Sequence, residues 1–130
     1  MTTGMCTMTK TETEYYQDDD KVLWGQQGLR HNEGKPQLSY VMLGKEVAAG
    51  EAAVWQRGAQ KYARGNWLKG MSWVSSSDSL LRHITAFLNG EDLDPETGLP
   101  HVDHIVCSAK ILSNSYHTRP ELDDRERTEK

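Results

Sequence analysis

The chain has 130 residues, 36% of them hydrophobic, and a formal net charge of −4. This length suits one domain with a modest core, and the acidic balance argues against a nucleic-acid polymer as the main partner, because that partner requires clustered Lys and Arg. No apolar run reaches the length of a membrane-spanning helix, and no signal-peptide core follows the first residues. We therefore expect no membrane contact and a cytoplasmic location.

The two ends of the chain differ in composition from its middle. Residues 1–20 are polar and rich in Thr, and residues 117–130 are highly charged, so we expect a disordered leader and a charged, disordered tail. Residues 21–116 are expected to form a single helical domain. Cys107 lies in an apolar helical run far from Cys6, so we expect a buried free thiol and no disulfide.

The first long helical pattern runs from Leu38 to about Ala63, with a break expected near Gly44. Glu46 and Glu51 on this helix are five residues apart and do not share a face, so we expect two exposed carboxylates.

A basic and aromatic segment follows over residues 58–70. It contains Lys61 and Tyr62, then a Gly65-Asn66 turn that ends the helix, and then Trp67. Cations next to aromatic rings on a loop suit a phosphate group and a stacked base. The sequence equally allows aromatic rings at the edge of the core and solvated cations.

The second helix is expected to begin at the N-cap cluster of residues 75–78 and to end near Gly90. Its apolar stripe is formed by Leu80, Leu81, Ile84, Phe87 and Leu88. His83 lies at the edge of this stripe, where a lone histidine is more often a core residue than a ligand.

Residues 89–100, NGEDLDPETGLP, form an acidic turn, because Pro95 and Pro100 exclude a continuous helix. In the third helix, which continues through an apolar pattern to Leu112, His101 and His104 stand three residues apart and share one face. Such imidazoles with carboxylates suit Zn²⁺, Mn²⁺, Fe²⁺ or Co²⁺ better than Mg²⁺. The alternative is that the turn carboxylates only cap this helix.

These elements predict an all-α fold, a small helical bundle with a functional acidic turn between two helices. Three main helices are few for a closed core, and the first is rich in alanine. We therefore expect a homo-oligomer.

Several short blocks in this order resemble the phage-encoded family named for the N-terminal domain of dATP/dGTP diphosphohydrolase. The blocks lie within about residues 28–113 and are Glu33-Gly34-Lys35-Pro36, Gly58-Ala59 with Lys61-Tyr62, Asn66-Trp67 with Lys69-Gly70, Arg82-His83, Gly90-Glu91-Asp92 with Asp94-Pro95-Glu96-Thr97-Gly98, and His101 with His104. The resemblance implies a phage protein of nucleotide metabolism, acting in the host cytoplasm.

The family name points in turn to the MazG-like pyrophosphohydrolases, all-α enzymes that use a divalent metal to cut a nucleoside triphosphate into the monophosphate and pyrophosphate. Those enzymes bind metal through E-x-x-E and E-x-x-D motifs, whereas this chain offers histidines at comparable places, so any structural likeness is at most distant.

The resulting hypothesis is a metal-dependent (deoxy)nucleoside triphosphate phosphohydrolase or pyrophosphohydrolase that uses Mn, Mg, Co or Zn. The expected metal ligands are His83, His101, His104 and Asp94, and the expected catalytic carboxylates are Glu96, Glu91 and Asp94. The expected substrate-binding residues are Lys35, Lys61, Tyr62, Asn66, Trp67 and Arg82. One alternative is a nucleotide-binding protein without turnover, of the sponge type that counters host defence. A third hypothesis is that the histidines and the turn only lock two helices together.

Overall fold

The computed structural model describes residues 27–128, so the expected leader over residues 1–20 lies outside the described part. The chain divides into two units, Met1–Gln37 and Leu38–Lys130. This boundary falls inside the domain expected over residues 21–116. The described part of the first unit is a loop with a turn in which the backbone N–H of Lys35 donates to the Asn32 carbonyl over 3.0 Å.

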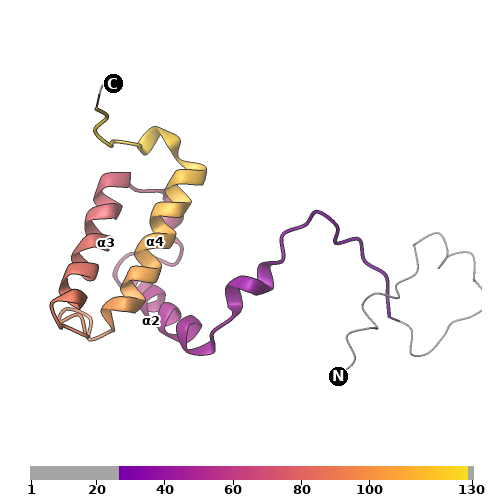
Figure 1. Cartoon of the computed structure of the whole chain (residues 1–130), viewed down its shortest axis with the longest axis horizontal. Coiled ribbons are helices and arrows are strands. Elements are labelled where there is room, and N and C mark those ends of the chain that lie inside the picture. The colour runs from indigo at the N-terminus through magenta and orange to yellow at the C-terminus, as the bar shows by residue number, and fades with distance from the viewer. Residues whose placement is uncertain (1–26, 129–130) are drawn as a thin grey trace, which may run out of the picture. The chain divides into compact units, whose positions relative to one another are not determined.

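The second unit is helical (Figure 1). Its elements are η2 (Leu38–Met42), α2 (Lys45–Lys61), η3 (Asn66–Lys69), α3 (Trp73–Leu88), α4 (His101–Thr118) and η4 (Pro120–Leu122). Within the described residues there is no strand, only an isolated bridge between Leu93 and Pro100. The predicted all-α fold is confirmed.

Helix α2 packs against α4. The break expected near Gly44 is present, since this glycine has a φ of 83° between η2 and the start of α2. At Gly50 the two helices approach so closely that an added Cβ would overlap the Asp103 carboxylate. The expectation for Glu51 is wrong: its side chain is only 16% exposed, pairs with Lys110 at 2.6 Å and accepts a hydrogen bond from the Trp55 indole.

Helix α3 begins earlier than the sequence suggests. Its N-cap is Ser72, whose hydroxyl accepts the backbone N–H of Ser75 over 3.1 Å. The predicted serine cluster therefore lies inside the first turns, where Ser76 and Ser77 donate their hydroxyls to the Ser72 and Trp73 carbonyls. The helix ends as predicted, with Gly90 following the C-cap at a φ of 94°.

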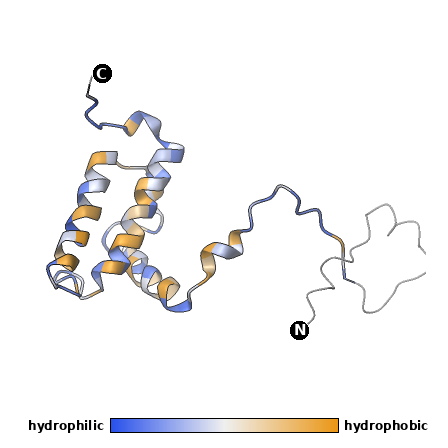
Figure 2. Cartoon of the chain, viewed as in Figure 1, coloured by the Kyte–Doolittle hydropathy of each residue, from blue (hydrophilic) through white to orange (hydrophobic). Residues whose placement is uncertain are grey.

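Helices α3 and α4 run antiparallel, side by side, and orange apolar bands mark both (Figures 1 and 2). Among the described residues, the buried apolar side chains are Trp73 and Cys107. Burial raises the pKa of the Cys107 thiol to about 12, so this cysteine is neutral, and it is free as predicted.

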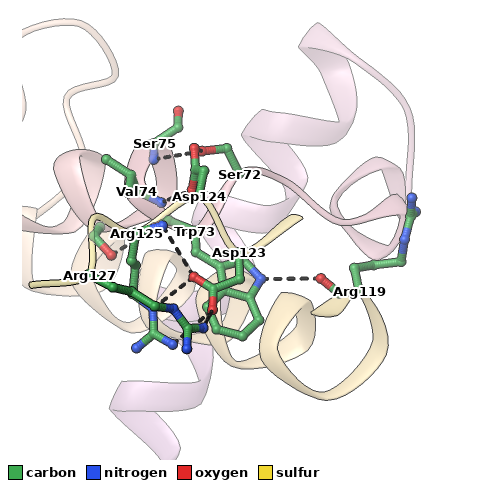
Figure 3. A network of polar contacts seen from close by, with 10 residues as sticks. Ser72, Trp73, Val74, Ser75, Arg119, Asp123, Asp124, Arg125 and Arg127 are labelled. Carbon is green, nitrogen blue, oxygen red and sulfur yellow. Dashed lines mark hydrogen bonds and ion pairs between the residues drawn. The ribbon is translucent and has the colours of Figure 1, made fainter. Parts of the chain in front are cut away.

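Residues 117–122 are largely helical, in the segment where a charged, disordered tail was expected. Helix α4 continues to Thr118, and the segment after η4 returns to the start of α3 (Figure 3). There the Asp124 carboxylate accepts from the Ser72 hydroxyl and from the backbone N–H of Val74, so it helps to cap α3. The Arg125 guanidinium lies 4.9 Å from the centre of the Trp73 ring. These contacts join the tail to residues about fifty positions away, which composition alone did not reveal.

Two glycines of α2 test how closely α2 and α4 must pack. Gly58→Ala is expected to raise the free energy of unfolding by about 0.5–1 kcal/mol, because alanine loses less conformational freedom than glycine in a helix. The added methyl group meets nothing within 4 Å, so no clash offsets this gain. Gly50→Ala is expected to lower it, because the Asp103 carboxylate must move away. Urea unfolding of both variants measures the difference, and equal gains in both would contradict the close packing.

Candidate functional site

The three predicted histidines converge at one end of the α3–α4 pair. His83 lies in α3, while His101 and His104 lie in the first turn of α4. The acidic turn between the helices closes through backbone hydrogen bonds, from Asp94 N–H to the Leu99 carbonyl over 2.8 Å and from His101 N–H to the Asp92 carbonyl over 2.9 Å. The turn therefore brings its own carboxylates to the histidines.

The ring nitrogens of these histidines are close to one another and to Asp94. The Nδ1 atoms of His83 and His101 are 2.9 Å apart, and the rings of His83 and His104 stack at 4.5 Å between centroids, 4° from parallel. Asp94 Oδ2 lies 3.7 Å from His83 Nδ1 and 3.9 Å from His104 Nε2.

The local environment favours charged Asp94 beside neutral histidines. Burial raises the pKa of Asp94, but hydrogen bonds from the backbone N–H groups of Glu96 and Thr97, together with the nearby histidines, bring it below the ordinary value. Burial lowers the pKa of both His83 and His104. Neutral imidazole is the form that binds metals.

Two further side chains orient the imidazoles. His101 is 4% exposed, and its Nε2 lies 2.7 Å from Glu91 Oε1. His104 Nε2 lies 2.8 Å from the Thr97 hydroxyl. If Nε2–H of His101 donates to Glu91, the Nδ1 of His101 carries a lone pair that faces His83. A carboxylate behind an imidazole is the usual support of a metal-binding histidine.

The residues present fit a divalent metal. One potential ligand atom from each of His83, Asp94 and His101 lies within 4.8 Å of the other two. Two imidazoles and one carboxylate suit Zn²⁺, Mn²⁺, Fe²⁺ or Co²⁺. The predicted ligand His104 lies outside this trio and stacks on it.

A charged cavity and an apolar cavity meet at the histidines. The charged cavity, of about 650 Å³, is lined by Val54, Arg57, Gly58, Gln60, Lys61, His83, Asp94, Glu96, Thr97 and His104. In it Lys61 Nζ lies 3.8 Å from Glu96 Oε1, and both side chains are largely exposed.

The apolar cavity, of about 530 Å³, includes Tyr62, Asn66, Trp67 and Cys107 in its lining and shares four residues with the charged cavity: Val54, Gly58, His83 and His104. One neighbour of Trp67 is Trp55, whose ring stacks on it at 4.6 Å. The predicted aromatic segment and the predicted histidines thus lie around two adjoining cavities.

One predicted substrate-binding residue, Arg82, does not line these cavities but a separate shallow depression on α3, with Asp78 and Leu81. Lys35 belongs to the first unit of the chain, which is described by itself. Conversely, sequence reasoning missed Arg57 and Thr97, which line the charged cavity. The four-residue spacing between Arg57 and Lys61 on one helix was the available signal for Arg57.

Fold and site together define a small all-α protein in which a turn between two antiparallel helices assembles a histidine–carboxylate cluster beside two cavities. The family model described as "dATP/dGTP diphosphohydrolase, N-terminal" matches residues 25–125. The chain belongs to this family, which confirms the predicted resemblance.

A relative from Salmonella phage PMBT28, described as "dATP/dGTP diphosphohydrolase", is 32% identical over 98 residues, which cover 75% of this chain and 33% of the relative. The chain thus spans about a third of the length of this curated relative. No solved structure matches the chain. Within its described residues, no helix is both long enough and apolar enough to cross a membrane.

Proposed function

We propose that this protein is a metal-dependent phosphohydrolase that acts on a (deoxy)nucleoside triphosphate in phage nucleotide metabolism. The convergence of His83, Asp94 and His101 carries the proposal, because their ligand atoms lie within 4.8 Å of one another. His83 and Asp94 also line the charged cavity, whose lining includes the side chains of Arg57 and Lys61. The relative described as a dATP/dGTP diphosphohydrolase supports a purine deoxynucleotide as the substrate class.

The residues of the cluster have distinct roles in this proposal. His83, His101 and Asp94 would hold the metal, and Glu91 keeps His101 in the required orientation. A divalent metal bound there supplies Lewis-acid activation of water and neutralises charge on the phosphoryl group. Glu96, which is exposed in the same cavity, takes the proton from the attacking water. Lys61 neutralises phosphate charge, and Tyr62 and Trp67 contact the base.

The second candidate is a nucleotide-binding protein without turnover. The observation that favours it is the length of the chain, which covers only 33% of the curated relative, so that the relative's catalytic residues could lie in the remaining two thirds. This candidate requires both cavities but no activated water.

We also propose that two copies associate, in the cytoplasm of the host. The side chains of Leu38, Tyr40, Val41, Met42 and Leu43 are between 67% and 71% exposed. Helix α2, which follows them, has no buried residue over its 17 residues. In a two-fold symmetric dimer, each copy would cover this exposed apolar segment of the other, so one contact would bury the segment on both chains.

Metal binding is tested by two histidine variants on the same helix. At a metal concentration a hundred times its Kd, wild type should gain about 2.7 kcal/mol of stability, whereas His101→Ala should lose both the bound metal and this gain. His117→Ala is the matched control, because its ring contacts Tyr116 outside the cluster. Elemental analysis and thermal unfolding measure both properties. Equal metal content in all three proteins would favour a cluster that only links helices.

Turnover is tested at Glu96. Glu96→Gln keeps the size of the side chain but removes its basicity, so kcat should fall about a hundredfold or more while nucleotide binding survives. Glu46→Gln, an exposed change on α2 that borders neither cavity, should retain activity. Product analysis on a panel of deoxynucleoside triphosphates with Mg²⁺, Mn²⁺, Co²⁺ and Zn²⁺ measures this. A wild type that binds nucleotide tightly yet releases no product would favour the binding protein.

Association is tested by making the exposed segment polar. The double change Val41→Ser and Leu43→Ser should convert a dimer into a monomer, because it removes apolar surface from both sides of the contact. Light scattering coupled to gel filtration measures the mass, and Glu126→Gln, an exposed change outside η2 and α2, serves as the control. A wild type that is monomeric at micromolar concentration would refute the proposal.

A further inference from the structure

The charged cavity contains two cations on one face of α2. Arg57 and Lys61 are four residues apart, one helical turn, so their side chains lie on the same side of the helix. Both line the cavity whose other wall is formed by His83, Asp94 and His104. The cations of α2 therefore face the histidine cluster of α3 and α4 across a single cavity.

The two cations differ in their partners. Lys61 lies 3.8 Å from the carboxylate of Glu96, whereas Arg57 has no carboxylate within ion-pair distance among residues 27–128. An exposed, uncompensated guanidinium at the edge of a cavity is suited to phosphate, because its planar fork donates two parallel hydrogen bonds to phosphate oxygens.

The charges of the cavity predict how an anion must bind. Two lining cations, Arg57 and Lys61, are matched by two lining carboxylates, Asp94 and Glu96, so these formal charges cancel. The cavity is therefore close to neutral overall. A polyphosphate would gain little electrostatic attraction from this cavity unless a metal ion were also bound. The trio of His83, Asp94 and His101 is suited to bind that metal ion.

The apolar cavity lies on the other side of the same histidines. His83 and His104 line both cavities, and so do Val54 and Gly58, so the two cavities adjoin at these four residues. Its lining includes the aromatic rings of Tyr62 and Trp67, which suit a flat base, together with Arg64. Each volume, about 530 and 650 Å³, falls within the range of small-molecule sites.

We infer that the charged cavity is the polyphosphate subsite, that Arg57 is its anchor, and that the polyphosphate binds together with the divalent metal while the base occupies the apolar cavity. The inference rests on the proposed function for the nature of the ligand, but it concerns binding and requires no turnover.

The test uses inorganic tripolyphosphate as a probe that has phosphates but no base, with the full-length protein and isothermal titration calorimetry. With saturating Mn²⁺, Arg57→Gln should weaken tripolyphosphate binding about ten- to a hundredfold, the scale of a lost charge-assisted hydrogen bond. Lys45→Gln is the matched control, because it removes a cation from the same helix but borders neither cavity. With EDTA in place of Mn²⁺, wild type should bind the probe far more weakly.

The base subsite is tested by Trp67→Ala, which should weaken binding of dATP while leaving tripolyphosphate binding unchanged. Equal losses in Arg57→Gln and Lys45→Gln, binding that is independent of Mn²⁺, or loss of both ligands in Trp67→Ala would overturn the inference.

Failure of the polyphosphate-subsite inference and failure of the proposed function would give different results. Tight Arg57-dependent binding without any product refutes the hydrolase alone, whereas turnover with an unchanged KM in Arg57→Gln refutes the polyphosphate subsite alone.

Discussion

The candidate site depends on the closure of the turn between α3 and α4. Two backbone hydrogen bonds draw its ends together, one between Asp94 and Leu99 and one between His101 and Asp92. With the turn closed, one oxygen of the Asp94 carboxylate accepts two backbone N–H groups, and the other oxygen faces His83 and His104. An open turn would leave the histidines of the two helices without this carboxylate, so the backbone of the turn sets the chemistry of the cluster.

Such a polar cluster costs free energy in a unit with so small an apolar core. The described residues bury only Trp73 and Cys107 among apolar side chains, yet they also bury His101 and hold Asp94 at 14% exposure. Burial of polar groups costs free energy unless they are paired, and here Glu91 pairs with His101. Well-packed apolar residues would join two helices at least as well. Polar groups gathered at such cost, with shifted pKa values, are typical of functional sites, which favours a site over a structural lock.

The sequence predicted the features that depend on local rules. Gly90 ends α3 because a glycine adopts positive φ readily, and helical spacing places His101 and His104 on one face of α4. The missed features depend on contacts between distant segments. The bonds from Asp124 to Ser72 and Val74 join residues about fifty positions apart, so no local pattern indicated that the tail is ordered. Arg57 was missed because only the packed structure brings its face of α2 to the histidines.

Helix α2 links the site to the stability of the unit. It has no buried residue, and its main packing is against α4, so it is held less firmly than α3. Yet α2 carries Arg57 and Lys61, while α3 and α4 carry the histidines across the cavity. A ligand that contacts both walls stabilises the folded arrangement by mass action, and most of that free energy would go into holding α2 in place. A small core would then be sufficient for this fold, because the proposed ligand would also contact α2 and complete its packing.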